Sequence, residues 1–357
     1  MINVTKTYLP NKEQYKKYID EIYANGWITN NGPMVRLLEK RLAKYLDVKN
    51  IVLVSNGTVA LEIAYRALGV EGDVITTPFS FVATTSSLVT NGLNPIFADI
   101  DSQTLNLDAN NIENMITKTT SAIVPVHVFG NSCEVEKIDA IAKKNNLKVV
   151  YDAAHAFNVQ YKGKSILNYG DISTLSFHAT KTFHSIEGGA LIINDDSLVE
   201  KVRYLINFGI KNREDIPELG TNAKMNEFEA AMGLCVLDDL KDLYTKRKSL
   251  YEFYEKELVD YVNLQEQNKD STQNYSYFPI ILENEEQLKK IEKALNEKKI
   301  YPRRYFYPSL DALSYINPPQ FREISRDIAN RILCLPLYPE LSKSIQKRII
   351  NIIQISI

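Results

Sequence analysis

Two stretches decide the fold of this chain, Val150-Tyr151-Asp152-Ala153-Ala154-His155 and Ser176-Phe177-His178-Ala179-Thr180-Lys181. In each, an apolar run gives way to polar side chains, which is typical of a buried strand that ends at the edge of a sheet. One strand end delivers a carboxylate and the other an amine. The second stretch closes on Glu187-Gly188-Gly189-Ala190, a tight turn into another apolar run.

Short apolar runs alternate with helical patterns on both sides of these stretches. Helical spacing is found at residues 59–68 and 135–145. This alternation predicts an α/β domain with a mostly parallel sheet that is buried on both faces, with its ligands at the C-terminal ends of the strands. The predicted strands are residues 51–54, 74–77, 95–98, 121–126, 148–151, 174–177 and 190–193.

The two ends of the chain show a different organisation. Residues 11–46 carry helical patterning that is interrupted by an Asn-, Gly- and Pro-rich loop at 25–33. A long helix is predicted from Asn226 to about Glu257, with room for a break near Leu243. A smaller α/β unit follows it. We therefore expect a large domain over residues 1–245, with an N-terminal arm over 1–35, and a small C-terminal domain over 246–357.

The composition argues against a protein that binds nucleic acid or an anionic membrane. The 357 residues are 45% hydrophobic and 24% charged, as in ordinary globular proteins, and the net charge of -2 gives no basic excess for nucleic acid or an anionic membrane. The N-terminus lacks the order of a signal peptide, so a cytoplasmic protein is expected. The three cysteines are far apart and are expected to be reduced thiols.

Asp152 and Lys181 are the two groups that pyridoxal phosphate chemistry requires. The carboxylate keeps the pyridine nitrogen protonated and the amine forms a Schiff base. Taken singly, Asp152 is equally compatible with a helix N-cap, and a lysine such as Lys181 is usually a solvated surface charge. Ser55-Asn56-Gly57-Thr58 precedes a predicted helix and indicates either a phosphate site or a plain N-cap.

Aromatic and imidazole side chains gather around the same segments. All four histidines, His127, His155, His178 and His184, fall in one part of the chain. Their spacing matches no zinc pattern, so a cofactor and substrate cleft explains them better than a metal site. Phe81 follows a strand end and either stacks on a planar ring or packs in the core.

An ordered set of motifs resembles the DegT/StrS-type family of nucleotide-sugar aminotransferases, which are fold-type I enzymes that use pyridoxal phosphate. The resemblance covers nearly the whole chain. It implies a mostly parallel seven-stranded sheet and a smaller C-terminal α/β domain. The motifs are Gly26–Pro33, Ser55–Leu61, Pro125–Gly130, Asp152–Ala156, Ser176–Gly189, Gly220–Asn226 and Leu335–Pro339.

The resemblance also implies roles for individual residues. Lys181 would bind the cofactor and carry the proton, and Asp152 would hold the pyridine nitrogen protonated. His155 stands where the family often has Gln, near the phenolic oxygen, and Phe81 would stack on the ring. The phosphate would be held by Gly57, Thr58 and Ser176, and by Asn222 from a neighbouring subunit, which implies a homodimer with shared active sites.

For the substrates, the resemblance implies L-glutamate as the amino donor and a keto sugar on a nucleotide diphosphate as the acceptor. The branch that it favours acts at C-4 of dTDP-4-keto-6-deoxy-D-glucose for surface glycan synthesis, and the alternative is a C-3 branch on dTDP-3-keto-6-deoxyhexose. A non-catalytic regulator, or another pyridoxal phosphate reaction on a non-sugar substrate, remains open. The candidate substrate residues are Trp27, Thr29, Phe183, His184, Glu187, Arg303, Tyr305 and Tyr307, with Arg303 or Arg304 paired to the diphosphate.

Overall fold

The centre of the molecule is a seven-stranded sheet with strand order β2-β10-β9-β6-β5-β3-β4. The computed structural model describes residues 1–357. Only β10 runs antiparallel to its neighbours, and all the other pairings are parallel. This confirms the predicted mostly parallel sheet. Its strands are β2 (Ile51–Val54), β3 (Asp73–Thr76), β4 (Asn94–Phe97), β5 (Thr120–Val124), β6 (Lys148–Asp152), β9 (Ile172–Ser176) and β10 (Gly189–Ile193).

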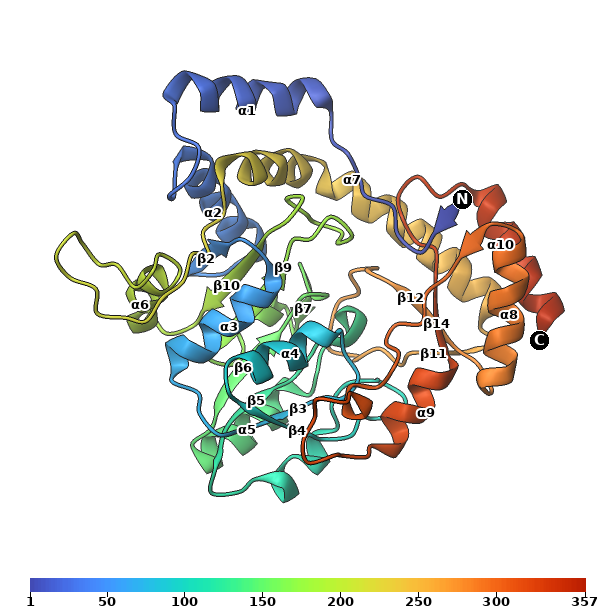
Figure 1. Ribbon diagram of the computed structural model, residues 1–357. Helices are drawn as coiled ribbons and strands as arrows, with labels where there is room; N and C mark the ends of the chain where they lie inside the picture. Colours follow the sequence, from blue (N-terminus) through green and yellow to red (C-terminus); the bar gives the residue numbers. More distant parts are fainter.

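Helices cover both faces of this sheet (Figure 1). One face packs on α3 (Gly57–Leu68), α4 (Val82–Thr90) and α6 (Ser197–Leu205). The other packs on α2 (Pro33–Leu46), α5 (Val135–Asn145) and the first half of α7 (Glu227–Leu258). Burial on both faces explains why strands such as β2 and β10 are apolar throughout.

A second, three-stranded antiparallel sheet lies beyond the large one, in the order β11-β12-β14. It forms a separate apolar cluster with the second half of α7, with α8 and with α10. The elements of this part are β11 (Asn263–Leu264), β12 (Phe278–Ile281), β14 (Ile332–Leu335), α8 (Glu285–Glu297), α9 (Glu323–Arg331) and α10 (Lys343–Ser356).

The N-terminus joins the two parts of the molecule. The first strand, β1 (Ile2–Asn3), pairs in parallel with β13 (Ile300–Tyr301), and α1 (Lys12–Asn25) then crosses to pack on α7. A small hairpin is formed by β7 (Gln160–Tyr161) and β8 (Lys164–Ser165). None of the helices has both the length and the apolar character needed to span a bilayer.

The long helix α7 spans 32 residues without interruption, so the break allowed near Leu243 does not occur. Its start is fixed by a capping box, in which Asn226 accepts from the backbone N–H of Glu229 and Glu229 reaches back to Asn226. Figure 1 shows α7 running from the large sheet to the small one. The proposed division near residue 245 therefore lies inside this helix.

A buried carboxylate ties α7 to α2. Glu227 is fully buried and accepts hydrogen bonds from the backbone N–H groups of Met34 (2.7 Å) and Val35 (3.0 Å). These are first-turn N–H groups of α2, which have no acceptor within their own helix. A Cβ atom at Gly32 would lie 2.5 Å from Cδ of Glu227, so a side chain there would push the carboxylate away from these two N–H groups.

We predict that Glu227→Gln lowers the free energy of unfolding by about 1–3 kcal/mol, because the amide group sets an N–H donor against a backbone donor in a buried site. Denaturant unfolding monitored by circular dichroism measures the change. Glu21→Gln, on the exposed side of α1, is the matched control. Equal stability of the two variants would contradict the capping role of Glu227.

Candidate active site

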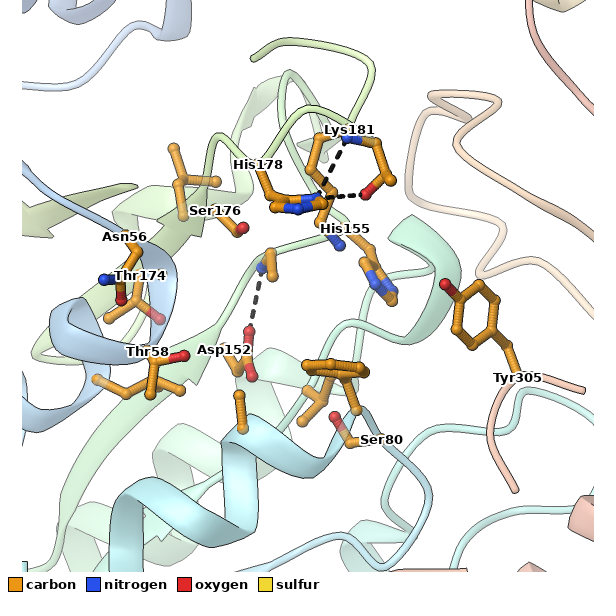
Figure 2. A pocket seen from close by; sticks show the side chains of 18 of the residues that line it. Asn56, Thr58, Ser80, Asp152, His155, Thr174, Ser176, His178, Lys181 and Tyr305 are labelled. Carbon is orange, nitrogen blue, oxygen red and sulfur yellow. Dashed lines mark hydrogen bonds between the residues drawn. The ribbon is translucent and has the colours of Figure 1, made fainter. Parts of the chain in front are cut away.

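The candidate site is a cavity of about 280 Å³ at the C-terminal ends of β6 and β9 (Figure 2). These strands are parallel neighbours, so their last residues reach the same edge of the sheet. The N-terminus of α3 closes one side. The residues around the cavity are Asn56, Gly57, Thr58, Leu61, Ser80, Phe81, Ala83, Val126, Asp152, Ala154, His155, Thr174, Leu175, Ser176, His178, Thr180, Lys181, Glu187, Tyr277, Arg303, Tyr305 and Phe306.

Lys181 enters the cavity from the loop between β9 and β10 (Figure 2). Burial lowers the pKa of its amine to about 8, and the nearby negative charge of Asp152 opposes that shift. The Nζ atom lies 5.8 Å from the centroid of the Tyr277 ring. An amine with this pKa is partly neutral near pH 7, which is the form that attacks a carbonyl carbon.

Asp152 ends β6 and is only 6% exposed. Its carboxylate accepts from the Thr84 hydroxyl (2.8 Å) and from the backbone N–H of Ala154 (3.1 Å). Burial raises the pKa of Asp152, while these hydrogen bonds and the charge of Lys181 lower it. No helix follows Asp152, so the N-cap interpretation fails. A buried carboxylate held only by neutral donors is suited to a cationic ligand.

The N-terminus of α3 meets the end of β9 at very short range. A Cβ atom at Gly57 would lie 2.8 Å from Cβ of Ser176, so only glycine allows this approach. Asn56 caps the helix by accepting from the N–H of Val59 (2.9 Å). The first-turn N–H groups of Gly57 and Thr58 have no acceptor within the helix. Together with the hydroxyls of Thr58 and Ser176, they form a cradle suited to a phosphate.

His155 forms an aromatic wall of the cavity. Its ring stacks on Phe306 (centroids 5.7 Å apart) and packs at a tilt against Tyr277 (4.8 Å). The backbone N–H of Phe129 donates to Nδ1 over 3.3 Å, so the neutral ring carries its proton on Nε2. Burial, followed by the charge of Lys181, holds the pKa of His155 well below its usual range. The ring is thus a neutral hydrogen-bond donor.

Most of the predicted cofactor residues line this cavity, and so do Glu187, Arg303 and Tyr305. Phe81 is 49% exposed at the start of α4, so it is not a core residue. Asn222 lies outside the cavity on the surface, as do Trp27 and Tyr307. Thr29 is partly buried and also lies outside it.

Phe183 and His184 do not line the cavity, although both were predicted to contact the substrate. Phe183 is 1% exposed and stacks on Phe157, with the centroids 4.7 Å apart. Nε2 of His184 is bonded to the carbonyl of Tyr8 (2.8 Å), and its Nδ1 accepts from the N–H of Ile186 (3.2 Å). Both side chains therefore serve packing, because the loop turns back on the core after Lys181.

The structure separates the two adjacent arginines. Arg303 lines the cavity and lies over the Tyr305 ring, with 4.4 Å between the guanidinium carbon and the ring centroid. Arg304 turns away and donates to Glu285 (3.1 Å) and to the carbonyl of Asn330 (3.2 Å). Arg303 is therefore the arginine that remains accessible to an anionic ligand.

Sequence reasoning missed several residues of the cavity. Tyr277 and Phe306 come from the smaller part of the chain, and no local pattern marks them as partners of β6. Ser80 and Thr84 form a hydroxyl pair (2.7 Å) that supports Asp152. The sequence marks His178 only by its position three residues before Lys181, and the structure places it in the cavity lining.

These residues fit pyridoxal phosphate: the α3 cradle suits its phosphate, Asp152 its ring nitrogen and Lys181 its aldehyde. We predict that Lys181 in the cofactor-free protein reacts with added pyridoxal phosphate at a rate that rises with pH through a midpoint near 8. Lysines in water titrate near ~10.4. Borohydride trapping followed by peptide mass spectrometry measures the rate, with the exposed Lys164 as the control. Equal pH profiles for the two lysines would contradict the lowered pKa.

Comparisons with known proteins agree with this site. The model of the DegT/DnrJ/EryC1/StrS aminotransferase family matches residues 10–354. The chain is 45% identical to the dTDP-4-amino-4,6-dideoxy-D-glucose transaminase of Shigella dysenteriae, over 99% of this chain and 98% of that one. It is 33% identical to the GDP-perosamine synthase of Escherichia coli O157:H7, over 92% and 91%.

Among solved structures, the fold matches that of DesI, whose crystal structure was analysed in the presence of its TDP-sugar product. The TM-score is 0.94, with 30% sequence identity and coverage of 99% of this chain and 92% of that one. The family match spans almost the whole chain and includes every element that builds the cavity. The chain belongs to the DegT/DnrJ/EryC1/StrS aminotransferase family and is a pyridoxal phosphate-dependent aminotransferase.

Proposed function

We propose that this aminotransferase moves the amino group of L-glutamate onto C-4 of dTDP-4-keto-6-deoxy-D-glucose. The enzyme works in the cytoplasm, and its amino sugar is used for surface glycan synthesis. The observation that carries the proposal is the 45% identity, over nearly the full length of both chains, to the transaminase named for that amino sugar. The similarity to DesI, which was crystallised with a TDP-sugar product, supports the dTDP carrier.

The cavity residues supply the proposed mechanism. Pyridoxal phosphate, when bound, would supply an electron sink for the bond that breaks at the amino carbon. Asp152 would keep the ring nitrogen protonated, and Gly57, Thr58 and Ser176 would hold the phosphate. Lys181, whose pKa is about 8, both accepts and releases a proton at Nζ near neutral pH. Because 2-oxoglutarate leaves the cavity before the keto sugar enters it, and the amino group stays behind, ping-pong kinetics follow.

Two further side chains support the cofactor in this proposal. The Nε2–H of His155 faces the cavity and donates to the phenolic oxygen of the cofactor. It takes the place of the amide N–H of the glutamine that the family often has at this position. Phe81 stacks on the ring. Arg303, rather than Arg304, pairs with the diphosphate, since Glu285 already engages Arg304.

The proposal includes a homodimer with shared sites. Asn222 is exposed and lies away from the cavity of its own chain. It therefore serves the phosphate of a partner's cofactor, or it serves no cofactor at all. Trp27 and Thr29 also lie outside the cavity, and under the same proposal they reach the substrate of the partner subunit.

A GDP-linked keto sugar is the second candidate acceptor, favoured by the similarity to GDP-perosamine synthase. Amination at C-3 of dTDP-3-keto-6-deoxyhexose is the alternative position on the dTDP sugar. A non-catalytic regulator is disfavoured, because such a protein has no need to place both Lys181 and Asp152 in one cavity.

We predict an amino sugar from L-glutamate and dTDP-4-keto-6-deoxy-D-glucose without any added isomerase, measured by mass spectrometry of the product. Product only after addition of a 3,4-ketoisomerase would assign the C-3 position instead. Product formed only from a GDP-linked 4-keto-6-deoxyhexose would show that the nucleotide carrier is GDP rather than dTDP. Lys181→Ala, loaded with cofactor, is expected to give no product from any acceptor, and retained turnover would refute its role.

A further inference from the structure

The cavity wall next to Lys181 carries a histidine and a glutamate from the same loop. The backbone N–H of Lys181 donates to the carbonyl of His178 over 2.8 Å, so both side chains leave one turn. Nε2 of His178 lies 3.5 Å from Oε1 of Glu187. The two side chains are 47% and 52% exposed while lining the cavity, so a ligand reaches both. Figure 2 shows the His178 ring beside Lys181.

Thr180 orients the His178 ring through contacts with Nδ1, the ring nitrogen on the side away from Glu187. The backbone N–H of Thr180 donates to Nδ1 over 3.3 Å, and the Thr180 hydroxyl lies 2.8 Å from the same nitrogen. A neutral ring in this position carries its proton on Nε2, the atom that faces Glu187. His178 thus presents a donor, and Glu187 presents an acceptor beside it.

The loop also fixes Glu187 in place. The Ser185 hydroxyl donates to the Glu187 carbonyl over 2.6 Å. A Cβ atom at Gly188 would lie 2.2 Å from Oγ of Ser185, so a side chain there would displace the Ser185 hydroxyl. Ile186 adopts φ +74°, which is unusual for a β-branched residue and is found mainly where the surrounding structure imposes it. The backbone that carries Glu187 is therefore held in one conformation within the single chain.

The hydrogen-bonding groups and the charge of this pair favour a sugar hydroxyl over a carboxylate. A sugar hydroxyl both donates and accepts, so it bridges the Nε2–H of His178 and the carboxylate of Glu187. A carboxylate of an amino donor only accepts and is repelled by Glu187. Glu187 also borders an open hollow with Glu62, which adds negative charge on that side. Arg303, which lines the same cavity, offers the donor's carboxylate a positive charge in the first half-reaction, and the same guanidinium pairs with the diphosphate in the second.

We propose that His178 and Glu187 together determine specificity for the keto sugar, by binding its ring hydroxyls in the second half-reaction only. The proposal rests on the proposed function, because it requires a sugar acceptor. In this proposal His178 donates a hydrogen bond to a sugar hydroxyl, and Glu187 accepts one from the same hydroxyl. The proposal also explains how one cavity accepts two dissimilar substrates in turn.

The test measures each half-reaction separately, from the absorbance of the bound cofactor, in wild type, His178→Phe and Glu187→Gln. The control is Glu71→Gln, an exposed glutamate before β3 at the opposite edge of the sheet. The acceptors are the parent dTDP-4-keto sugar and its C-2 and C-3 deoxy analogues. We expect both cavity variants to slow the sugar half-reaction by about 10- to 100-fold in kcat/KM. The glutamate half-reaction should change by less than about threefold.

A smaller loss with one deoxy analogue than with the parent sugar is also expected, because the hydroxyl that the pair binds is already absent. Equal losses in both half-reactions, or equal losses with all three acceptors, would overturn the proposal. If wild type reacts with glutamate but with no keto sugar, the proposed function fails instead, and the wild-type measurement alone identifies that outcome.

Discussion

The site depends on holding a lysine and an aspartate in one cavity, where Asp152 is buried and Lys181 is half-buried. Burial makes the charged form of each less favourable, so the pKa of Lys181 falls to about 8 and that of Asp152 rises, while each charge opposes the shift of the other. Neutral donors from Thr84 and Ala154 keep the carboxylate satisfied. The protein therefore keeps a reactive amine, and a carboxylate ready for a cationic ring, before any cofactor arrives.

The order of the strands makes this arrangement possible. β6 and β9 are parallel neighbours, so their ends reach one edge together, and the antiparallel β10 links β9 to β2. Gly57 and Gly189 then let the start of α3 approach the sheet, since a side chain at either position would collide with the backbone or with Ser176. The phosphate cradle and the two ionisable groups are thus consequences of a single strand order.

The sequence predicted the parts of this site that depend on local pattern. One apolar run ends at Asp152 and another lies shortly before Lys181, which predicts that both groups lie at the same edge of the sheet, and both line the cavity. Side-chain direction within the loop after β9 was not predictable, because Phe183 turns back onto Phe157 while His178 faces the cavity. Tyr277 and Phe306 join through long-range packing, which no periodicity reveals. Asn222 and Trp27 stay on the surface of the single chain, since their proposed roles need a second copy.

The most direct test of aminotransfer at Lys181 follows the visible absorbance of the cofactor bound to the purified protein. We predict that L-glutamate alone removes the band of the lysine-bound cofactor and that the dTDP-linked 4-keto sugar then restores it, because one cavity serves both half-reactions in turn. A band that glutamate leaves unchanged would contradict aminotransfer at Lys181. A band that glutamate removes and no nucleotide-linked keto sugar restores would contradict the sugar acceptor.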